Sequence, residues 1–166
     1  HNMMNLPVSL DVIDHIEVLK GAAASRYGIN ALHGAINIIT KSPKHTGLSA
    51  HAFSGSSFQR DTSNQKLFAG YGMEINASLD MGATEHYLSL SSMGSSGYRY
   101  NSAMKTHKIF YQNQINLPHE GTMRVMGGYI SNSFGANGFY APPADVESKE
   151  ALQTAVAAIS AELPLN

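Results

Sequence analysis

The sequence has no cysteine, few charged residues and no long apolar run. The absence of cysteine excludes disulfide scaffolds, cysteine-ligated zinc, iron–sulfur clusters and thiol nucleophiles. Charged residues make up 14% of the 166 residues, whereas average soluble proteins have roughly 25%. The formal net charge is −1, so there is no basic excess to attract nucleic acid. No apolar run approaches about 18 residues, which excludes a membrane-spanning helix but not spanning strands, whose alternating pattern is weaker.

The sequence also lacks the residue spacings on which enzyme chemistry depends. Its eight histidines are scattered singly, without the His-x-x-x-His spacing that places two zinc ligands on one helix face. There is no Gly-x-Ser-x-Gly elbow, no Gly-x-x-x-x-Gly-Lys phosphate loop and no pair of neighbouring carboxylates suited to acid–base work. We therefore expect no catalytic residues, no metal site and no cofactor, and predict that the chain is not an enzyme.

Two short extended segments stand near the start of the chain, at residues 13–19 and 35–40. The first alternates apolar and polar residues, and the second is rich in β-branched side chains, which favour strands. Residues 22–27 between them predict a short helix, so this part reads as a small β-α-β unit. A polar linker that contains proline follows. We expect residues 1–43 to form one domain and residues 44–166 a second.

Beyond residue 47 the sequence alternates apolar and polar residues in runs of about ten, as strands between two unlike environments do. The clearest run is 65–76, and 107–117 and 122–131 repeat it. Residues 78–93 shift phase near Thr84, which predicts a bulge or a strand boundary. On one face of the clearest run lie Leu67, Ala69, Tyr71, Met73 and Ile75.

The expected connections are of two lengths. Residues 118–121 form a tight turn, whereas residues 94–105 and 132–150 are long and rich in Gly, Ser and Asn. Short turns at one end of a sheet and long loops at the other are typical of transmembrane β-barrels. About six strands fit the pattern, so the sequence predicts a mainly all-β protein with six antiparallel strands.

A run of residues near the start carries a resemblance to a known family. Its motif is Ile16-Glu17-Val18-Leu19-Lys20-Gly21, then Ser25, Tyr27-Gly28, Ala31 and Gly34, and then Ile36-Asn37-Ile38-Ile39-Thr40-Lys41. This motif resembles the end of the plug domain of TonB-dependent outer-membrane receptors. Lys20 stands where the family usually has arginine, and Ala22 where it often has proline. The loop motifs Gly97-Tyr-Arg-Tyr-Asn101 and Phe134-Gly-Ala-Asn-Gly-Phe-Tyr140 look like those of Bacteroidetes-type receptors similar to cobalamin and siderophore receptors.

The resemblance implies a plug domain ending at residue 43 and, over 44–166, the first strands of a transmembrane β-barrel that is incomplete here. Barrels of this kind have about 22 strands, so we expect the chain to be an internal piece of a longer receptor. It implies energised uptake of a large nutrient across the outer membrane of a Gram-negative bacterium. The implied partners are the TonB-ExbB-ExbD complex, which pulls a plug segment absent here, the nutrient, and outer-membrane lipid. The resemblance also favours a strand at residues 146–163, although their apolar residues fit a helical stripe.

Aromatic and polar residues at the plug apex and in the long loops are the candidate ligand contacts. Aromatic side chains bury much area at little entropic cost, which suits a large ligand; filling of the barrel lumen or packing within the loops is the other reading. The candidates are Arg26, Tyr27, Asn30, Tyr98, Arg99, Tyr100, Phe134, Asn137, Phe139 and Tyr140.

Two further sets of residues receive expected roles. Glu17 and Lys20 are candidates for ion pairs between plug and barrel, or else lie on a solvated strand edge. Tyr71, Tyr111 and Tyr129 are expected to face lipid or its interface. The alternative function is a soluble all-β binding or adhesion module, which would need a second layer over its apolar sheet face.

Overall fold

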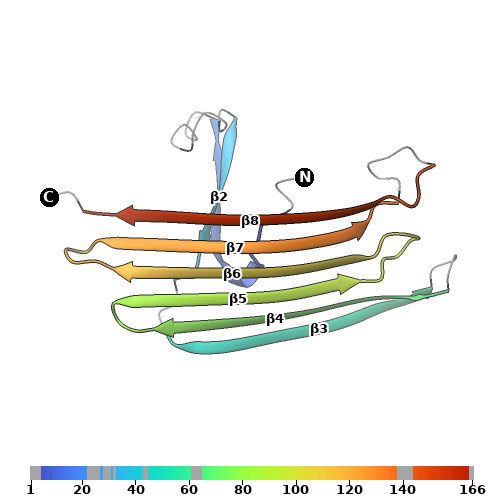
Figure 1. Cartoon of the computed structure of the whole chain (residues 1–166), viewed down its shortest axis with the longest axis horizontal. Coiled ribbons are helices and arrows are strands. Elements are labelled where there is room, and N and C mark those ends of the chain that lie inside the picture. The colour runs from blue at the N-terminus through green and yellow to red at the C-terminus, as the bar shows by residue number, and fades with distance from the viewer. Residues whose placement is uncertain are drawn as a thin grey trace. The chain divides into compact units, whose positions relative to one another are not determined.

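The computed structural model describes residues 5–21, 27, 31, 33–42, 45–60, 65–137 and 144–164, and it is an all-β structure. A six-stranded antiparallel sheet has the order β3-β4-β5-β6-β7-β8, so every strand pairs with its neighbours in sequence (Figure 1). None of the helical segments among the described residues has the length and apolar character needed to cross a bilayer. The strands are β3 (Gly47–Arg60), β4 (Leu67–Asp80), β5 (Thr84–Ser95), β6 (Met104–Asn116), β7 (Thr122–Gly135) and β8 (Lys149–Glu162).

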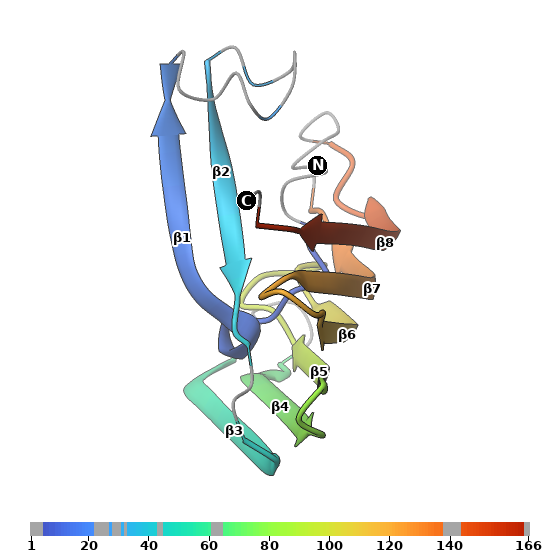
Figure 2. The same cartoon turned by 90° about the vertical axis from the view of Figure 1, so that its left-hand side faces the viewer.

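A separate two-stranded hairpin precedes the sheet in sequence. A single 3-10 turn, η2 (Leu10–Val12), leads into β1 (Ile13–Lys20), which pairs antiparallel with β2 (Gly34–Thr40) (Figure 2). The two expected strands are confirmed. The helix expected at 22–27 lies outside the described residues except for Tyr27.

The chain divides into two compact units, residues 9–42 and a second unit formed by residues 1–8 together with 43–166. The boundary between residues 42 and 43 lies beside the division expected at residue 43. The boundary between residues 8 and 9 is not among the expected ones; it arises because residues 5–8 pack on the sheet. The Asn5 side-chain amide donates a hydrogen bond to Thr154 Oγ1 at 2.5 Å, and Lys108 Nζ donates one to the Val8 carbonyl at 3.1 Å.

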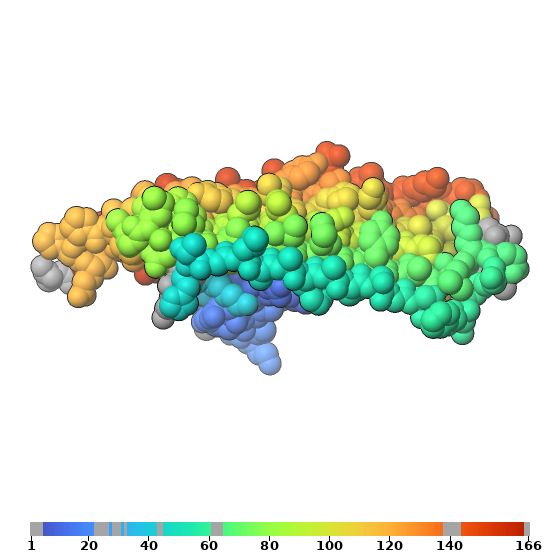
Figure 3. Space-filling view, turned by 90° about the horizontal axis from the view of Figure 1, so that it is seen from below, coloured from blue at the N-terminus to red at the C-terminus, as the bar shows by residue number. Residues whose placement is uncertain are grey.

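The predicted strand pattern of the larger unit is confirmed, with six antiparallel strands. The phase shift near Thr84 is a strand boundary, because β4 ends at Asp80 and β5 begins at Thr84. Residues 149–162 are strand β8 and not a helix, since every position pairs with β7. The edge of the sheet along β3 faces the viewer in Figure 3, with the other strands stacked behind it.

The six strands have two chemically different faces, which we call the apolar face and the polar face. Residues paired across neighbouring strands point to the same side of a sheet, so the register assigns each side chain to a face. One row crosses the whole sheet and places six residues side by side on the apolar face: Ala50, Ile75, Leu90, Ile109, Tyr129 and Ala155. The row beside it on the polar face holds Ser49, Asn76, Ser89, Phe110, Gly128 and Val156.

Burial on the two faces is the reverse of what a soluble sheet shows. Met73, Tyr71 and Ile109 on the apolar face keep 51%, 52% and 43% of their surface exposed. On the polar face Gln112, with 1% exposed, is buried beside Phe110 and Ile130. Antiparallel sheets of soluble proteins bury the apolar face and solvate the polar one, so this sheet is inverted.

Candidate functional site

The long connections of the sheet gather at one end of the strands. Residues 61–66, 96–103 and 136–148 link strands at this end, whereas 81–83 and 117–121 link them at the other (Figure 1). We call these the long-loop end and the short-turn end. The alternation of connection lengths expected from the sequence is therefore present. The candidate ligand contacts of the sheet, from Tyr98 to Tyr100 and at Phe134 and Asn137, all lie at the long-loop end.

Asn101 joins two of the long loops. Its side-chain amide donates hydrogen bonds to the carbonyl oxygens of Val146, at 2.8 Å, and Ser148, at 2.7 Å. The backbone of Asn101 has a φ of 48°, a left-handed conformation that asparagine adopts more readily than most residues. Because both amide hydrogens are used on carbonyls of the β7–β8 connection, this one side chain fixes the β5–β6 connection against it.

Other contacts strengthen the same junction. Tyr100 donates its hydroxyl hydrogen to the carboxylate of Glu147. The Gly135 amide donates to the Ala103 carbonyl at 2.9 Å, and within the β7–β8 connection the Ala136 amide donates to the Ser148 carbonyl, also at 2.9 Å. A Cβ on Gly135 would meet the backbone oxygen of Asn101 at 2.2 Å, so only glycine allows the loop to approach this strand. The two loops consequently form one joined structure.

Tyr98 and Arg99 form the exposed tip of this structure. The guanidinium carbon of Arg99 lies 4.8 Å from the centre of the Tyr98 ring, a cation–π arrangement. Tyr98 keeps 66% of its surface exposed. Ser102 Oγ donates to the Arg99 carbonyl and accepts from the Arg99 amide, which holds the tip as a tight turn. The tip therefore presents a cation and an aromatic ring to solvent at the long-loop end.

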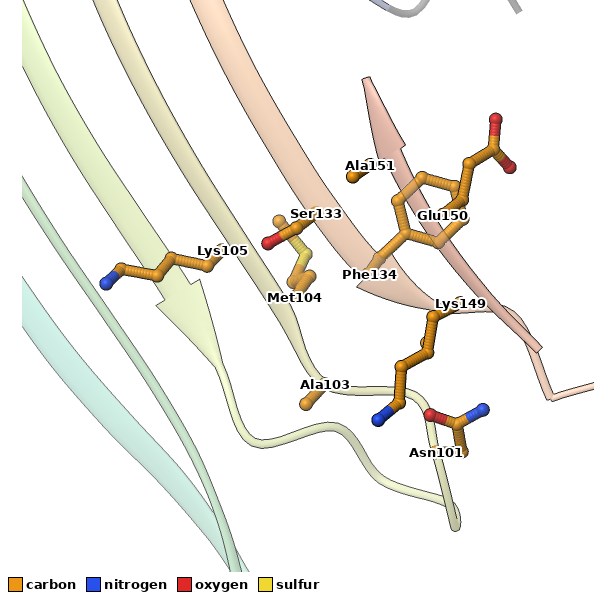
Figure 4. A pocket seen from close by; sticks show the side chains of 10 residues that line it. Asn101, Ala103, Met104, Lys105, Ser133, Phe134, Lys149, Glu150 and Ala151 are labelled. Carbon is orange, nitrogen blue, oxygen red and sulfur yellow. The ribbon is translucent and has the colours of Figure 1, made fainter. Parts of the chain in front are cut away.

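A hollow of about 440 Å³ that is open to solvent lies below the joined loops, across the ends of β6, β7 and β8. Phe134 lines it, as do Asn101 and three charged residues, and Figure 4 shows Lys149 extending toward Asn101. Phe134 is the predicted site residue that the structure places in this hollow. Its lining residues are Asn101, Ala103, Met104, Lys105, Ser133, Phe134, Gly135, Lys149, Glu150 and Ala151.

Several predicted site residues are not brought to this place by the described structure. Arg26, Asn30, Phe139 and Tyr140 lie outside the described residues. Asn137 is half-buried directly after β7, with a φ of 39°. Tyr27 belongs to the hairpin unit, where its hydroxyl oxygen accepts a hydrogen bond from Asn37 at 3.3 Å.

The two residues expected to pair with the barrel also belong to the hairpin unit. Glu17 accepts a hydrogen bond from the Asn37 amide at 2.9 Å and lies 3.8 Å from His15 Nε2. Lys20 pairs with Gly34 in the ladder and, three positions along from Glu17, points to the opposite face of the hairpin. The role of both in plug–barrel contacts stays a prediction.

One histidine of the hairpin has a perturbed pKa. His15 Nδ1 lies 2.7 Å from a carboxylate oxygen of Asp14, and this hydrogen bond raises the pKa of His15 above its ordinary value. Nearby Glu17 acts in the same direction. No group of three or more His, Asp or Glu side chains in the described ranges is arranged to hold a metal ion.

The sequence did not identify Asn101, Lys105 and Lys149 as site residues. Asn101 is the last residue of the loop motif Gly97-Tyr-Arg-Tyr-Asn101, and its position after Tyr98 and Tyr100 is the sequence signal that could have identified it. No sequence signal points to Lys105 and Lys149, because only the register of β6, β7 and β8 brings them to the same hollow. Comparison with models of known protein families, with curated proteins and with solved structures finds no significant match to this chain.

Proposed function

We propose that the chain is part of a TonB-dependent outer-membrane receptor and forms the end of its plug and the first strands of its barrel wall. The observation that carries the proposal is the inverted sheet. Apolar side chains stay exposed on one face, while the other face buries polar side chains such as Gln112 together with the apolar Phe110 and Ile130. Exposing a continuous apolar face to water is unfavourable by about 25 cal/mol per Å². A hydrocarbon environment removes that penalty, and so it accounts for the pattern.

The height of the apolar band fits a bilayer. On β4 every side chain of this face is apolar from Leu67 to Leu79, about 41 Å along the strand at about 3.4 Å per residue, or about 31 Å in height for a strand tilted by about 40°. Barrels of the outer membrane carry an apolar band about 25 Å tall. Tyr111 and Tyr129 lie on the same face and are 41% and 39% exposed, as expected of side chains that contact lipid.

The band is also displaced along the strands from one strand to the next, as tilted strands require. On β4 apolar residues continue to Leu67 at the long-loop end. In the row that contains Met73, the positions on β6, β7 and β8 are already polar: His107, Ser131 and Gln153. The band therefore shifts toward the short-turn end from β4 to β8. Strands of a barrel are tilted and staggered, and a level membrane would cross such strands at successively shifted positions.

The polar face suits the interior of a filled barrel. Arg124 donates a hydrogen bond to Gln114 at 2.8 Å, and Thr106 donates one to Asn132 at 2.8 Å. Pro7, fully buried, packs at Gly128 on this face, where a Cβ on the glycine would meet the ring at 2.9 Å. A face with buried polar pairs and a chain segment laid across it is expected where protein occupies the lumen.

In this proposal the joined loops at the long-loop end face the outside of the cell and contribute to binding a large nutrient of the cobalamin or iron-chelate class. Tyr98, Arg99 and Tyr100 are the proposed contacts. An exposed ring with a guanidinium over it offers an apolar surface and a cation at one place. Both suit a large, partly apolar ligand with anionic groups.

A soluble all-β binding module is the competing function. It would bury Leu67, Tyr71 and Ile109 under a second layer, whereas these side chains are 41%, 52% and 43% exposed. If the chain were such a module, we would expect a monodisperse, cooperatively melting protein in plain buffer. The receptor proposal predicts aggregation, or dependence on detergent, for the chain produced alone, because apolar area and unpaired edges are exposed.

The test is uptake by the complete receptor gene that contains this chain, expressed in cells that lack their own receptors for the tested nutrients. We expect at least one radiolabelled cobalamin or iron chelate to accumulate, and accumulation to stop when a protonophore removes the energy source. A Tyr98→Ala and Tyr100→Ala double variant should reduce uptake more than Tyr71→Ala with Tyr129→Ala, the same pair of changes on the apolar face. Absence of energy-dependent uptake for every ligand would refute the proposed function.

A further inference from the structure

The charges on the two faces of the sheet are distributed unequally. All five carboxylates of the six strands lie on the polar face, at Glu74, Asp80, Glu85, Glu150 and Glu162. The apolar face carries no carboxylate on its strands. It carries cations instead, and these are at the long-loop end: Arg60, Lys105 and Lys149. On the same face the short-turn end has His86 and Thr84 and neither lysine nor arginine on its strands.

Lys105 and Lys149 are available to a ligand. Within the described part of the chain neither ammonium group makes a hydrogen bond or an ion pair. Glu150 follows Lys149 in sequence, but successive side chains of a strand point to opposite faces. Figure 4 shows its carboxylate directed away from the ammonium of Lys149. The positive charge of this lysine is therefore not neutralised by its neighbour.

The two lysines line one hollow together with Ser133, and Glu150 also lines it from the polar face. Lys105 is paired with Ser133, and Ser133 with Ala151, so the lysines stand on strands two apart, about 10 Å across the sheet. Each side chain is long and flexible. Figure 4 shows the ammonium of Lys105 directed away from Ser133, and rotation about the bonds of the two long side chains would bring both ammonium groups to an anionic group placed over Ser133. Toward the short-turn end, the same face passes one polar row, His107, Ser131 and Gln153, and then reaches the apolar row of Ile109, Tyr129 and Ala155.

We propose that this margin of the apolar face binds an anionic membrane lipid, with its phosphate at Lys105, Lys149 and Ser133 and its acyl chains along the apolar band. The proposal rests on the membrane placement given above. Charge complementarity selects the lipid class: a face with cations at one margin, no carboxylate and an apolar centre matches a molecule with an anionic head and apolar tails. Lysines near an anionic lipid surface attract it by Coulomb interaction.

The test measures lipid adducts of the full chain by native mass spectrometry from dodecyl maltoside micelles, whose sugar headgroup has no phosphate. The probes are phosphatidic acid, phosphatidylcholine and diacylglycerol. We expect the wild-type chain to retain phosphatidic acid in preference to the other two. Lys105→Gln and Lys149→Gln should each weaken this retention about fivefold, the equivalent of about 1 kcal/mol for one lysine.

Matched variants separate a specific site from net charge and from misfolding. Lys41→Gln with Lys66→Gln makes the same change of charge outside the strands and should retain phosphatidic acid. Lys105→Arg with Lys149→Arg keeps the charge and should retain it as well. Circular dichroism confirms that each variant has β structure before adducts are compared.

Two results would overturn the lipid site and leave the receptor proposal standing. One is equal retention of phosphatidic acid by the wild-type chain and the Lys105→Gln, Lys149→Gln double variant in micelles. The other is displacement of the lipid by an equal concentration of inorganic phosphate, which would identify a phosphate site and not a lipid site. A chain that is monodisperse in buffer without detergent would overturn both proposals.

Discussion

At the scale of single residues, Asn101 is the side chain that joins the two loops at the long-loop end. Its amide supplies both hydrogen bonds that run from the β5–β6 connection to the carbonyls of Val146 and Ser148. Each is worth about 0.5–1.5 kcal/mol when its partner would otherwise be solvated. Loss of both therefore frees the loops without unfolding the sheet.

Substitution of Asn101 by Asp tests this role with almost no change of shape. A carboxylate cannot donate to the two carbonyls and would face them with negative charge, so we predict that the loops separate. Amide hydrogen exchange at Gly135, which donates to the Ala103 carbonyl of the β5–β6 connection, should become at least tenfold faster. Ser102→Ala is the control, because Ser102 bonds only within its own loop. Unchanged exchange at Gly135 in the Asp variant would show that the junction does not depend on Asn101.

His15 in the hairpin gives a prediction about pH. Its pKa is raised by the hydrogen bond to Asp14, so the folded hairpin favours the imidazolium form. The stabilisation is present below the unfolded pKa of His15 and is lost as pH rises through the higher folded value. We expect the midpoint of His15 in an NMR titration to lie above about 6.5 and to fall in the Asp14→Asn variant. Identical midpoints in the two proteins would contradict this assignment.

At the scale of elements, β7 has a glycine on each face at neighbouring positions. Gly128 on the polar face lies against the ring of Pro7, whereas a Cβ on Gly127, on the apolar face, would meet only an ordinary contact at 3.7 Å. We predict that Gly128→Ala displaces residues 5–8 from the sheet at a cost of about 1–3 kcal/mol. Hydrogen–deuterium exchange of a peptide covering residues 1–10 should rise in Gly128→Ala and stay unchanged in Gly127→Ala. Equal exchange in both variants would show that Gly128 does not position this segment.

The elements differ in how well the sequence predicts them. Strands β4, β6 and β7 are evident from the sequence because their side chains alternate between apolar and polar. The Ser- and Gly-rich sequence of β3 alternates weakly, and its ladder with β4 defines it. In β8 the alanines favour a helix by intrinsic propensity, but pairing along β7 outweighs that preference. The loop motif predicted Tyr98 and Tyr100 as site residues, whereas Lys105 and Lys149 could be assigned to the site only once the register of the strands was known.

At the scale of the whole molecule, the environment of the apolar face distinguishes a barrel wall from a soluble binding module. Leu67, Tyr71, Ile109 and the rest of the band are exposed, and polar residues such as Gln112 are buried. Hydrocarbon outside and a wet, protein-filled interior explain both observations together. A soluble sheet explains neither, since it would expose the amide of Gln112 and cover Ile109.

The most direct test is a nitroxide scan along β6, residues 105–116, in the complete receptor reconstituted in a bilayer. We predict that accessibility to oxygen, which partitions into hydrocarbon, alternates with period two. It should be high at Ile109, Tyr111 and Ile115 and low at Phe110, Gln112 and Gln114. A water-soluble nickel chelate should not reach the first set. Low oxygen accessibility at Ile109, Tyr111 and Ile115, as under a covering protein layer, would contradict the account.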